Sequence, residues 1–134
     1  MKTFFDPRQR AHDPQFFMAN GVRQPSPEQP ARVDALLAGL QSLKLAPEAP
    51  PDRGLGPIAA VHGAEYLTFL KTIHDRWQRI PGAGPEVVPN IHPDRREAGY
   101  PRSAVGQAGY HQADTACPIG PATWDAAYLS AQCA

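Results

Sequence analysis

The sequence predicts an α or α/β domain, made mostly of helices and long loops with one or two strands. Apolar residues recur at helical spacing in several stretches, which favours amphipathic helices. The 16 prolines and 11 glycines separate these stretches and indicate long loops between them. A length of 134 residues fits one domain with a core of useful size.

The opening segment, residues 2–5, is apolar and β-prone and is bounded by Asp6-Pro7, which predicts a short first strand. Residues 11–31 are rich in Pro, Asn, Gln and Gly without a helical period, so we expect a long loop. Phe16, Phe17 and Met18 stand in a row inside this loop. They either anchor the loop on the core or line a pocket or a subunit contact.

The helices are predicted from the apolar period. The first begins at Arg32 and runs to Leu43. A proline-rich segment, residues 46–57, follows it, and residues 58–62 fit either a short buried strand or a turn. The first helix carries its apolar stripe at Val33, Leu36, Leu37, Leu40 and Leu43.

The second half of the chain alternates helices and loops. A second amphipathic helix covers residues 66–80, and a second long loop covers residues 81–103. A third helix is expected from Ala104 to Ala116, and a last one begins at Pro121 and runs to the final residue. One or two strands cannot form a sheet covered on both faces by these helices. Either further strands follow this segment or the protein is all-helical.

Charge and composition narrow the function classes. Lys plus Arg and Asp plus Glu number 13 each, so no overall field favours nucleic acid or an anionic membrane, while a cationic substrate stays compatible. No run of about 18 apolar residues exists, and the N-terminus lacks the apolar segment of a secretory signal. We therefore expect a soluble cytoplasmic protein.

Histidine and cysteine spacing gives little support for a metal site in this segment. The pair His111 and Asp114 is the best local candidate, three residues apart on one predicted helix face, although a hydrogen-bonded structural pair explains it as well. Cys117 and Cys133 lack metal-ligand spacing and are expected to be reduced thiols. The other histidines are scattered at positions 12, 62, 74 and 92.

The loop at residues 81–103 concentrates positive charge. Arg95, Arg96 and Arg102 could hold an anion or pair with carboxylates, and a solvated loop explains them equally well. No glycine-rich phosphate loop, nucleophile elbow or Cys/His/Asp constellation is present. On composition and spacing alone the function stays open.

Four separated segments, in their order and spacing, carry a resemblance to a known superfamily. Together they resemble the N-terminal part of the zinc-dependent deacetylases that include histone deacetylases and acetylpolyamine amidohydrolases, and the acetylpolyamine branch in particular. The segments are Pro27–Arg32, then Val61–Leu70 extended by Asp75–Trp77, then Pro93, Arg95 and Arg96 with Gly106–Tyr110, and finally Pro121–Ala127.

The resemblance implies a fold and a domain assignment. Residues 1–134 would form the N-terminal portion of a single three-layer α/β/α domain of the arginase/deacetylase fold, truncated before the metal site. In open α/β sheets of this kind, ligands bind outside the carboxyl ends of the strands. The missing strands would follow Ala134, which accounts for the low strand count.

The resemblance also implies a reaction. The full-length protein would use Zn²⁺, held by two Asp and one His, with a tandem His pair to hydrolyse the acetamide of an acetylated polyamine or an acetyl-lysine-like amine. These residues are expected downstream of Ala134, so this segment would contain no catalytic residue and no metal ligand, and would be inactive alone. A homodimer of the full-length protein is a further implication.

The contribution expected of this segment is the rim of the substrate pocket. Asp114 matches one of the acidic side chains that attract the distant ammonium groups of a polyamine, whereas Phe17 and Val105 stand where two other acids are expected. The rim residues implied by the resemblance are Phe16, Phe17, Met18, Asn20, His92 and Asp114.

Two alternatives come from other classes of protein. The chain could be a stand-alone, non-catalytic binding or assembly module that uses exposed helix faces. It could also be an inactive remnant whose helices expose apolar stripes because the sheet is absent. A stable folded protein favours the first alternative, and aggregation or molten behaviour favours the second.

Overall fold

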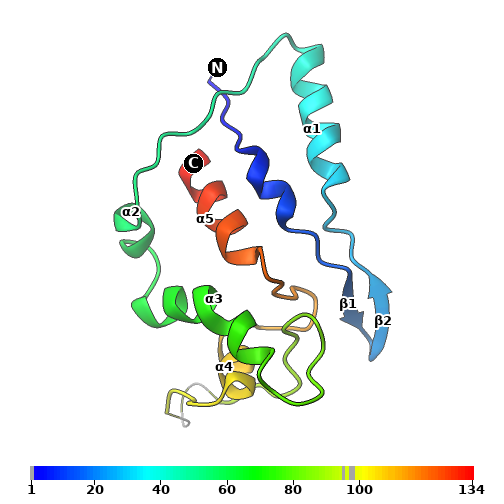
Figure 1. Ribbon diagram of the computed structural model, residues 1–134, viewed down its shortest axis with the longest axis vertical. Coiled ribbons are helices and arrows are strands. Elements are labelled where there is room, and N and C mark those ends of the chain that lie inside the picture. The colour runs from blue at the N-terminus through cyan, green and yellow to red at the C-terminus, as the bar shows by residue number, and fades with distance from the viewer. Residues whose placement is uncertain (1, 95, 97–98) are drawn as a thin grey trace.

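The computed structural model describes residues 2–94, 96 and 99–134, which form an α/β segment with one two-stranded sheet (Figure 1). This confirms the predicted class and strand number. Within these residues no helix is long and apolar enough to cross a membrane. In chain order the elements are the 3₁₀ helix η1 (Pro7–Ala11), β1 (Phe16–Ala19), β2 (Val22–Pro25), α1 (Ala31–Ser42), α2 (Gly56–Ala59), α3 (Ala64–Trp77), α4 (Ala104–His111) and α5 (Thr123–Cys133).

The predicted strand at residues 2–5 is wrong. Phe4 makes only an isolated parallel bridge with Glu48, through Phe5 N–H to Glu48 O at 3.0 Å and Glu48 N–H to Thr3 O at 2.9 Å. The chain then turns into η1, because the Asp6 side chain accepts the Arg8 N–H and Pro7 occupies the first turn. One bridge on one side does not make a ladder.

A β-hairpin occupies the segment that was expected to be a long loop. β1 and β2 pair antiparallel from Phe16 with Pro25 to Ala19 with Val22. Asn20 and Gly21 form the turn with φ of 51° and 75°, the left-handed conformation that two-residue hairpin turns require. The Arg23 guanidinium lies 4.1 Å from the centre of the Phe16 ring. The Asn-Gly pair is a strong hairpin signal that overrides the polar composition around it.

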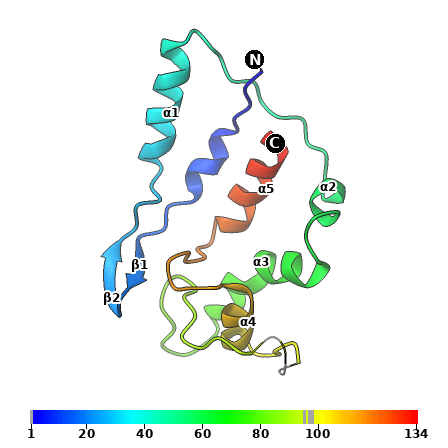
Figure 2. The same ribbon diagram turned by 180° about the vertical axis from the view of Figure 1, so that it is seen from behind.

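The helix predicted at residues 32–43 is confirmed as α1, but within the described residues it buries no side chain. Leu36 and Leu43 are each 69% exposed. In both views α1 lies at one edge of the molecule and α2 at the opposite edge, with η1 and α5 side by side between them (Figures 1 and 2). The ambiguous segment at residues 58–62 is the end of α2 and a turn, not a strand.

The core lies where α3 and α4 pack together. α3 is the helix predicted at residues 66–80, although it ends at Trp77, whose indole N–H donates to Gly84 O at 3.2 Å. Residues Val87 and Ile119 close the core through an antiparallel bridge with N–O distances of 2.9 and 3.1 Å. The buried cluster comprises Phe69, Ile73, Trp77, Val87, Ala108 and Ile119.

The third helix, α4, ends at His111 instead of the predicted Ala116. Gln112 already has an extended backbone, and its side-chain amide donates to Val87 O at 3.3 Å and Cys117 O at 2.8 Å. These bonds hold the following residues in a loop that returns to the core. His111 and Asp114 therefore do not share a helix face, and that prediction is wrong.

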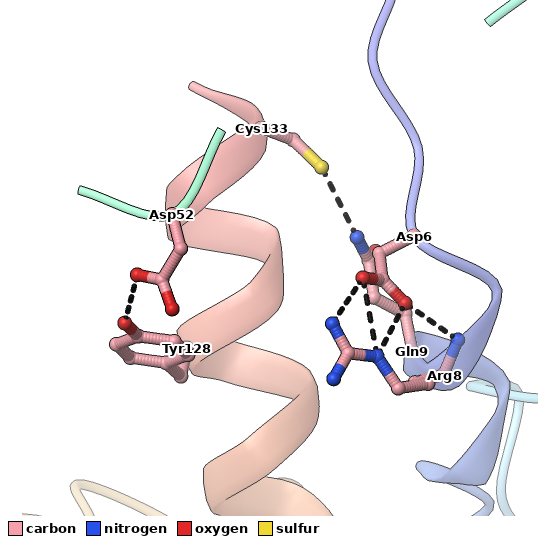
Figure 3. Close-up of polar contacts among 6 residues, drawn as sticks. All are labelled: Asp6, Arg8, Gln9, Asp52, Tyr128 and Cys133. Carbon is pink, nitrogen blue, oxygen red and sulfur yellow. Dashed lines mark hydrogen bonds and ion pairs between the residues drawn. The ribbon is translucent and has the colours of Figure 1, made fainter. Parts of the chain in front are cut away.

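Polar contacts join η1, α5 and residues 52–54 (Figure 3). Asp6 binds the Arg8 guanidinium, and this hydrogen bond holds the pKa of the Asp6 carboxyl below its usual value. The Gln9 amide lies 3.2 Å from Cys133 Sγ, and the Tyr128 hydroxyl donates to Asp52. Cys117 and Cys133 form no disulfide in the described structure, and their reduced state stays a prediction.

Candidate functional site

Strand β1 lies against the loop that follows α4. Met18 N–H donates to Thr115 O at 3.1 Å, and the Thr115 hydroxyl donates to Met18 O at 3.0 Å. These bonds place the predicted rim residues 16–18 beside the segment that contains Asp114. The three β1 side chains are half-buried, while Asn20 at the hairpin turn is exposed.

The loop at residues 81–103, called the second rim loop because it contains His92, packs directly on α4. A Cβ at Gly109 would lie 1.6 Å from Ile91 O, so only glycine permits this approach. His92, which is otherwise exposed, places its Nδ1 3.3 Å from Gly109 O. The two glycines of the Gly106–Tyr110 motif thus have a physical role, because Gly106 similarly accommodates the Pro101 side chain.

Two further contacts fix the end of this loop. The Gln107 amide donates to Pro101 O at 2.8 Å, and its oxygen accepts from the Arg76 guanidinium. Arg76 also donates to Arg102 O at 3.1 Å. Of the predicted cationic group, Arg102 is exposed, the Arg96 N–H donates to Asp94 Oδ1 at 2.8 Å, and Arg95 lies outside the described residues.

Asp114 presents an exposed carboxylate at the loop after α4. Its Oδ1 accepts the Ala116 N–H at 2.8 Å and lies 3.6 Å from Cys117 Sγ. Cys117 is exposed as a residue, but partial desolvation of its thiol raises the pKa, and the Asp114 charge raises that pKa further. Cys117 is therefore a poor nucleophile at neutral pH.

A cavity of about 310 Å³ opens between α3, α5 and the loop after α4. His111 stands in its aromatic wall, with its ring centre 4.4 Å from that of Phe69 and 5.6 Å from that of Tyr66. The Nε2 of His111 lies 2.9 Å from the Tyr100 hydroxyl, whose pKa is raised by burial. His12 and Thr123 also line the cavity, with His12 Nδ1 3.1 Å from the Thr123 hydroxyl.

The cavity is large enough to hold part of a small ligand. The lining combines aromatic faces with polar groups, including the Glu28 carboxylate, which suit an amide or an ammonium group. In residues 2–94, 96 and 99–134, no three His, Cys, Asp or Glu side chains come together to hold a metal ion. The described side chains therefore do not fit a zinc site.

The structure brings together only part of the predicted rim. Phe16, Phe17 and Met18 lie next to the Asp114 loop, whereas His92 is placed by α4 and Asn20 by the hairpin turn. Sequence reasoning missed Tyr100, which reaches His111 from the loop, and Glu86, which is buried and accepts the N–H of Gln15, directly before β1. An acid directly before the apolar Val87-Val88 pair is a weak signal that could have identified Glu86.

The sequence of the chain is similar to those of known acetylpolyamine amidohydrolases. No protein-family model matches the chain. An acetylpolyamine amidohydrolase of Burkholderia pseudomallei is 40% identical over 100% of this chain and 39% of its own length. Acetylpolyamine amidohydrolase 1 of Pseudomonas aeruginosa is 36% identical, over 100% of this chain and 40% of its own length.

A solved structure gives the same result for the fold. The crystal structure of an acetylpolyamine aminohydrolase from Burkholderia pseudomallei matches with a TM-score of 0.90 at 39% identity, covering 98% of this chain and 38% of the crystallised one. This chain spans about two fifths of the length of the relatives it matches.

Proposed function

We propose, for a chain that corresponds to the N-terminal part of acetylpolyamine amidohydrolases, that the complete protein hydrolyses the acetamide of an acetylated amine. The observation that carries this proposal is the match to these amidohydrolases over the whole chain in both sequence and fold. We further propose that the enzyme depends on Zn²⁺. The described residues offer no zinc site, so we assign the ion's ligands to the part of the protein outside this chain.

The chain and the remainder of the protein are proposed to form one domain. An apolar groove of about 810 Å³ lies between residues 3–5, α1 and α5. Leu36 of α1 and Leu43, directly after α1, border it and are largely exposed in the described structure. Because relatives are more than twice as long as this chain, the rest of the domain is the proposed cover for this groove.

The part proposed for this segment is the rim of the substrate pocket. Its apolar side comes from Phe16, Phe17 and Met18, and its charge comes from the exposed carboxylate of Asp114. Asn20 and His92 complete the set. An ammonium group at the far end of an acetylated polyamine, or the peptide around an acetyl-lysine-like amine, would contact these residues. A homodimer and a cytoplasmic location remain proposals from the sequence.

The function is tested by the acetate that the complete protein and the 134-residue chain release from acetylated amines. We expect the complete protein to deacetylate them and the chain alone to release none. Chelation should abolish the activity, and added Zn²⁺ should restore it. Hydrolysis by the chain itself, or failure of the complete protein on both acetylated polyamines and acetyl-lysine compounds, would contradict the proposal.

The substrate class is tested at Asp114. In Asp114→Asn, KM for an acetylated polyamine should rise by up to about fivefold, because an exposed charge pair contributes about 1 kcal/mol or less. For an uncharged acetylated amine KM should not change. Equal KM changes for both substrates would show that the Asp114 carboxylate does not interact with the ammonium group of the substrate.

The exposed face of α1 favours one alternative function, a non-catalytic binding or assembly module. Leu36 and Leu43 present a large apolar surface that a partner protein could cover. A stable 134-residue chain that forms a defined oligomer, together with the absence of hydrolysis by the complete protein, would favour that reading.

A further inference from the structure

A buried carboxylate holds the base of the hairpin. Glu86, in the loop between α3 and α4, is 6% exposed, and its Oε1 accepts the Gln15 N–H at 2.8 Å. Gln15 directly precedes β1, and its carbonyl accepts the Ser26 N–H at 3.4 Å, just beyond β2. One side chain of the second rim loop is thus bonded to the point where both hairpin strands meet the rest of the chain.

The hairpin has a second anchor three residues further along β1. There Met18 exchanges two hydrogen bonds with Thr115, in the loop after α4. Both anchoring segments are themselves connected, because Val87 next to Glu86 pairs with Ile119. Gln112, 5% exposed, adds a side-chain bond from that same loop to Val87 O.

These contacts connect three segments in pairs. Glu86 bonds the hairpin base to the second rim loop, Val87 bonds that loop to the loop after α4, and Thr115 bonds the loop after α4 back to the hairpin at Met18. Every β2 residue is exposed, and an isolated two-stranded sheet is marginally stable, so β2 itself gives the hairpin little support. The two anchors, together with the half-buried side chains of β1, connect the hairpin to the rest of the described residues.

We infer that Glu86 is a positioning residue that couples the two rim loops and thereby sets substrate discrimination; the discrimination part rests on the proposed function. Burying a carboxylate costs free energy unless it is hydrogen-bonded, and a buried donor that loses its acceptor is costly too. The second oxygen, Oε2, has no hydrogen-bond partner among the described residues. The contribution of Glu86 thus comes through the Gln15 N–H, which places Phe16 to Met18.

The experiment uses the complete protein and three variants. Glu86→Leu removes the acceptor, while Glu86→Gln removes the charge but keeps an oxygen for the Gln15 N–H. Glu65→Leu is the matched control, because it makes the same change at an exposed position on α3. The primary measurement is the rate at which trypsin cleaves after Arg23 in the exposed strand β2, with the peptide identified by mass spectrometry.

We expect Glu86→Leu to raise the Arg23 cleavage rate by about tenfold or more, because cleavage follows the free energy of local opening. Glu86→Gln should restore most of the protection, and Glu65→Leu should behave as the wild type. The same loss should change the ratio of KM values for a long and a short acetylated amine more than it changes kcat. An unchanged cleavage rate in Glu86→Leu would overturn the inference.

A second measurement keeps the test informative if Glu86→Leu does not fold. In the wild-type protein the Gln15 amide should exchange with solvent at least about tenfold more slowly than the amide of exposed Asp13. Equal exchange would contradict the anchor. Both structural readouts are independent of hydrolysis, so an inactive protein with a protected hairpin would reject the proposed function and leave the coupling of the loops standing.

Discussion

Helices α3 and α1 carry similar apolar stripes in the sequence but have different surroundings in the structure. α3 buries Phe69, Ile73 and Trp77 against α4 and the Val87–Ile119 bridge. α1 buries none of its side chains against the described residues and borders an open apolar groove. An amphipathic pattern therefore predicts that a helix forms, but not whether its partner lies within the same segment.

The difference separates two parts of this chain. Around α3 and α4, the buried apolar side chains pack against one another and against Val87 and Ile119, and the loop at residues 81–103 is packed against glycine and held by Arg76 and Gln107. Around α1 the apolar face borders a groove shared with residues 3–5, Gln9 of η1 and α5, and the described residues bury none of the α1 side chains. The α3/α4 part has a buried core within the described residues, whereas the α1 part is proposed to require the remainder of the domain.

We expect the largest change in the free energy of unfolding from a substitution in the α3 core. Ile73 is fully buried, so Ile73→Ala should lower the free energy of unfolding by about 2–5 kcal/mol. Leu36→Ala is the contrasting change at an exposed site and should alter it by about 0.5 kcal/mol or less in the 134-residue chain. Chemical denaturation of both variants measures the two free energies of unfolding. Equal decreases in both variants would contradict the difference between α3 and α1.

A smaller effect is expected where the loop contacts α4. Gly109→Ala places a methyl group against Ile91 O, and relieving that clash should cost about 1–3 kcal/mol. Gly39→Ala in α1 is the matched control, since nothing lies within 4 Å of its Cβ position. That control should be neutral or stabilising, because alanine favours a helix. Thermal unfolding of both variants measures the difference. A Gly109→Ala variant as stable as the wild type would contradict the close packing of Gly109 against Ile91.

The smallest effect concerns pH at η1. The Arg8 hydrogen bond lowers the pKa of Asp6 below the usual 3.8, so the carboxylate stabilises the fold above that value. This contribution is lost as the pH falls through the lowered pKa. Asp6→Asn keeps a capping oxygen and removes the charge, so it should be less stable than the wild type near neutral pH. The two stability curves should converge in acid; a constant difference would show that the charge is not the cause.

The sequence was a good guide wherever one local rule determined the outcome. The stripe from Tyr66 to Trp77 predicted α3, and the ordered motifs pointed to the related amidohydrolases that the comparisons then matched. The hairpin differs from the loop that composition predicts, because the Asn20-Gly21 turn decides the local structure in spite of the polar residues around it. The early end of α4 could not be predicted, since it depends on Gln112 binding the Val87 carbonyl of a distant segment as well as the Cys117 carbonyl of the following loop.

The candidate site was less predictable than the fold. Residues 16–18 and the Asp114 loop are remote in sequence and meet through Met18 and Thr115, whose bonds use backbone atoms and one hydroxyl. Glu86 gives almost no sequence signal, because its role depends on a backbone N–H 71 residues away. Such tertiary contacts have no local period to reveal them.

The most direct test of the difference between the two parts is amide hydrogen exchange in the 134-residue chain and in the complete protein. We predict that the amides of α3 and α4 are protected in both forms, while those of α1 become protected only in the complete protein. Equal protection of α1 in the isolated chain would contradict the account, because α1 would then be stable without the remainder of the domain.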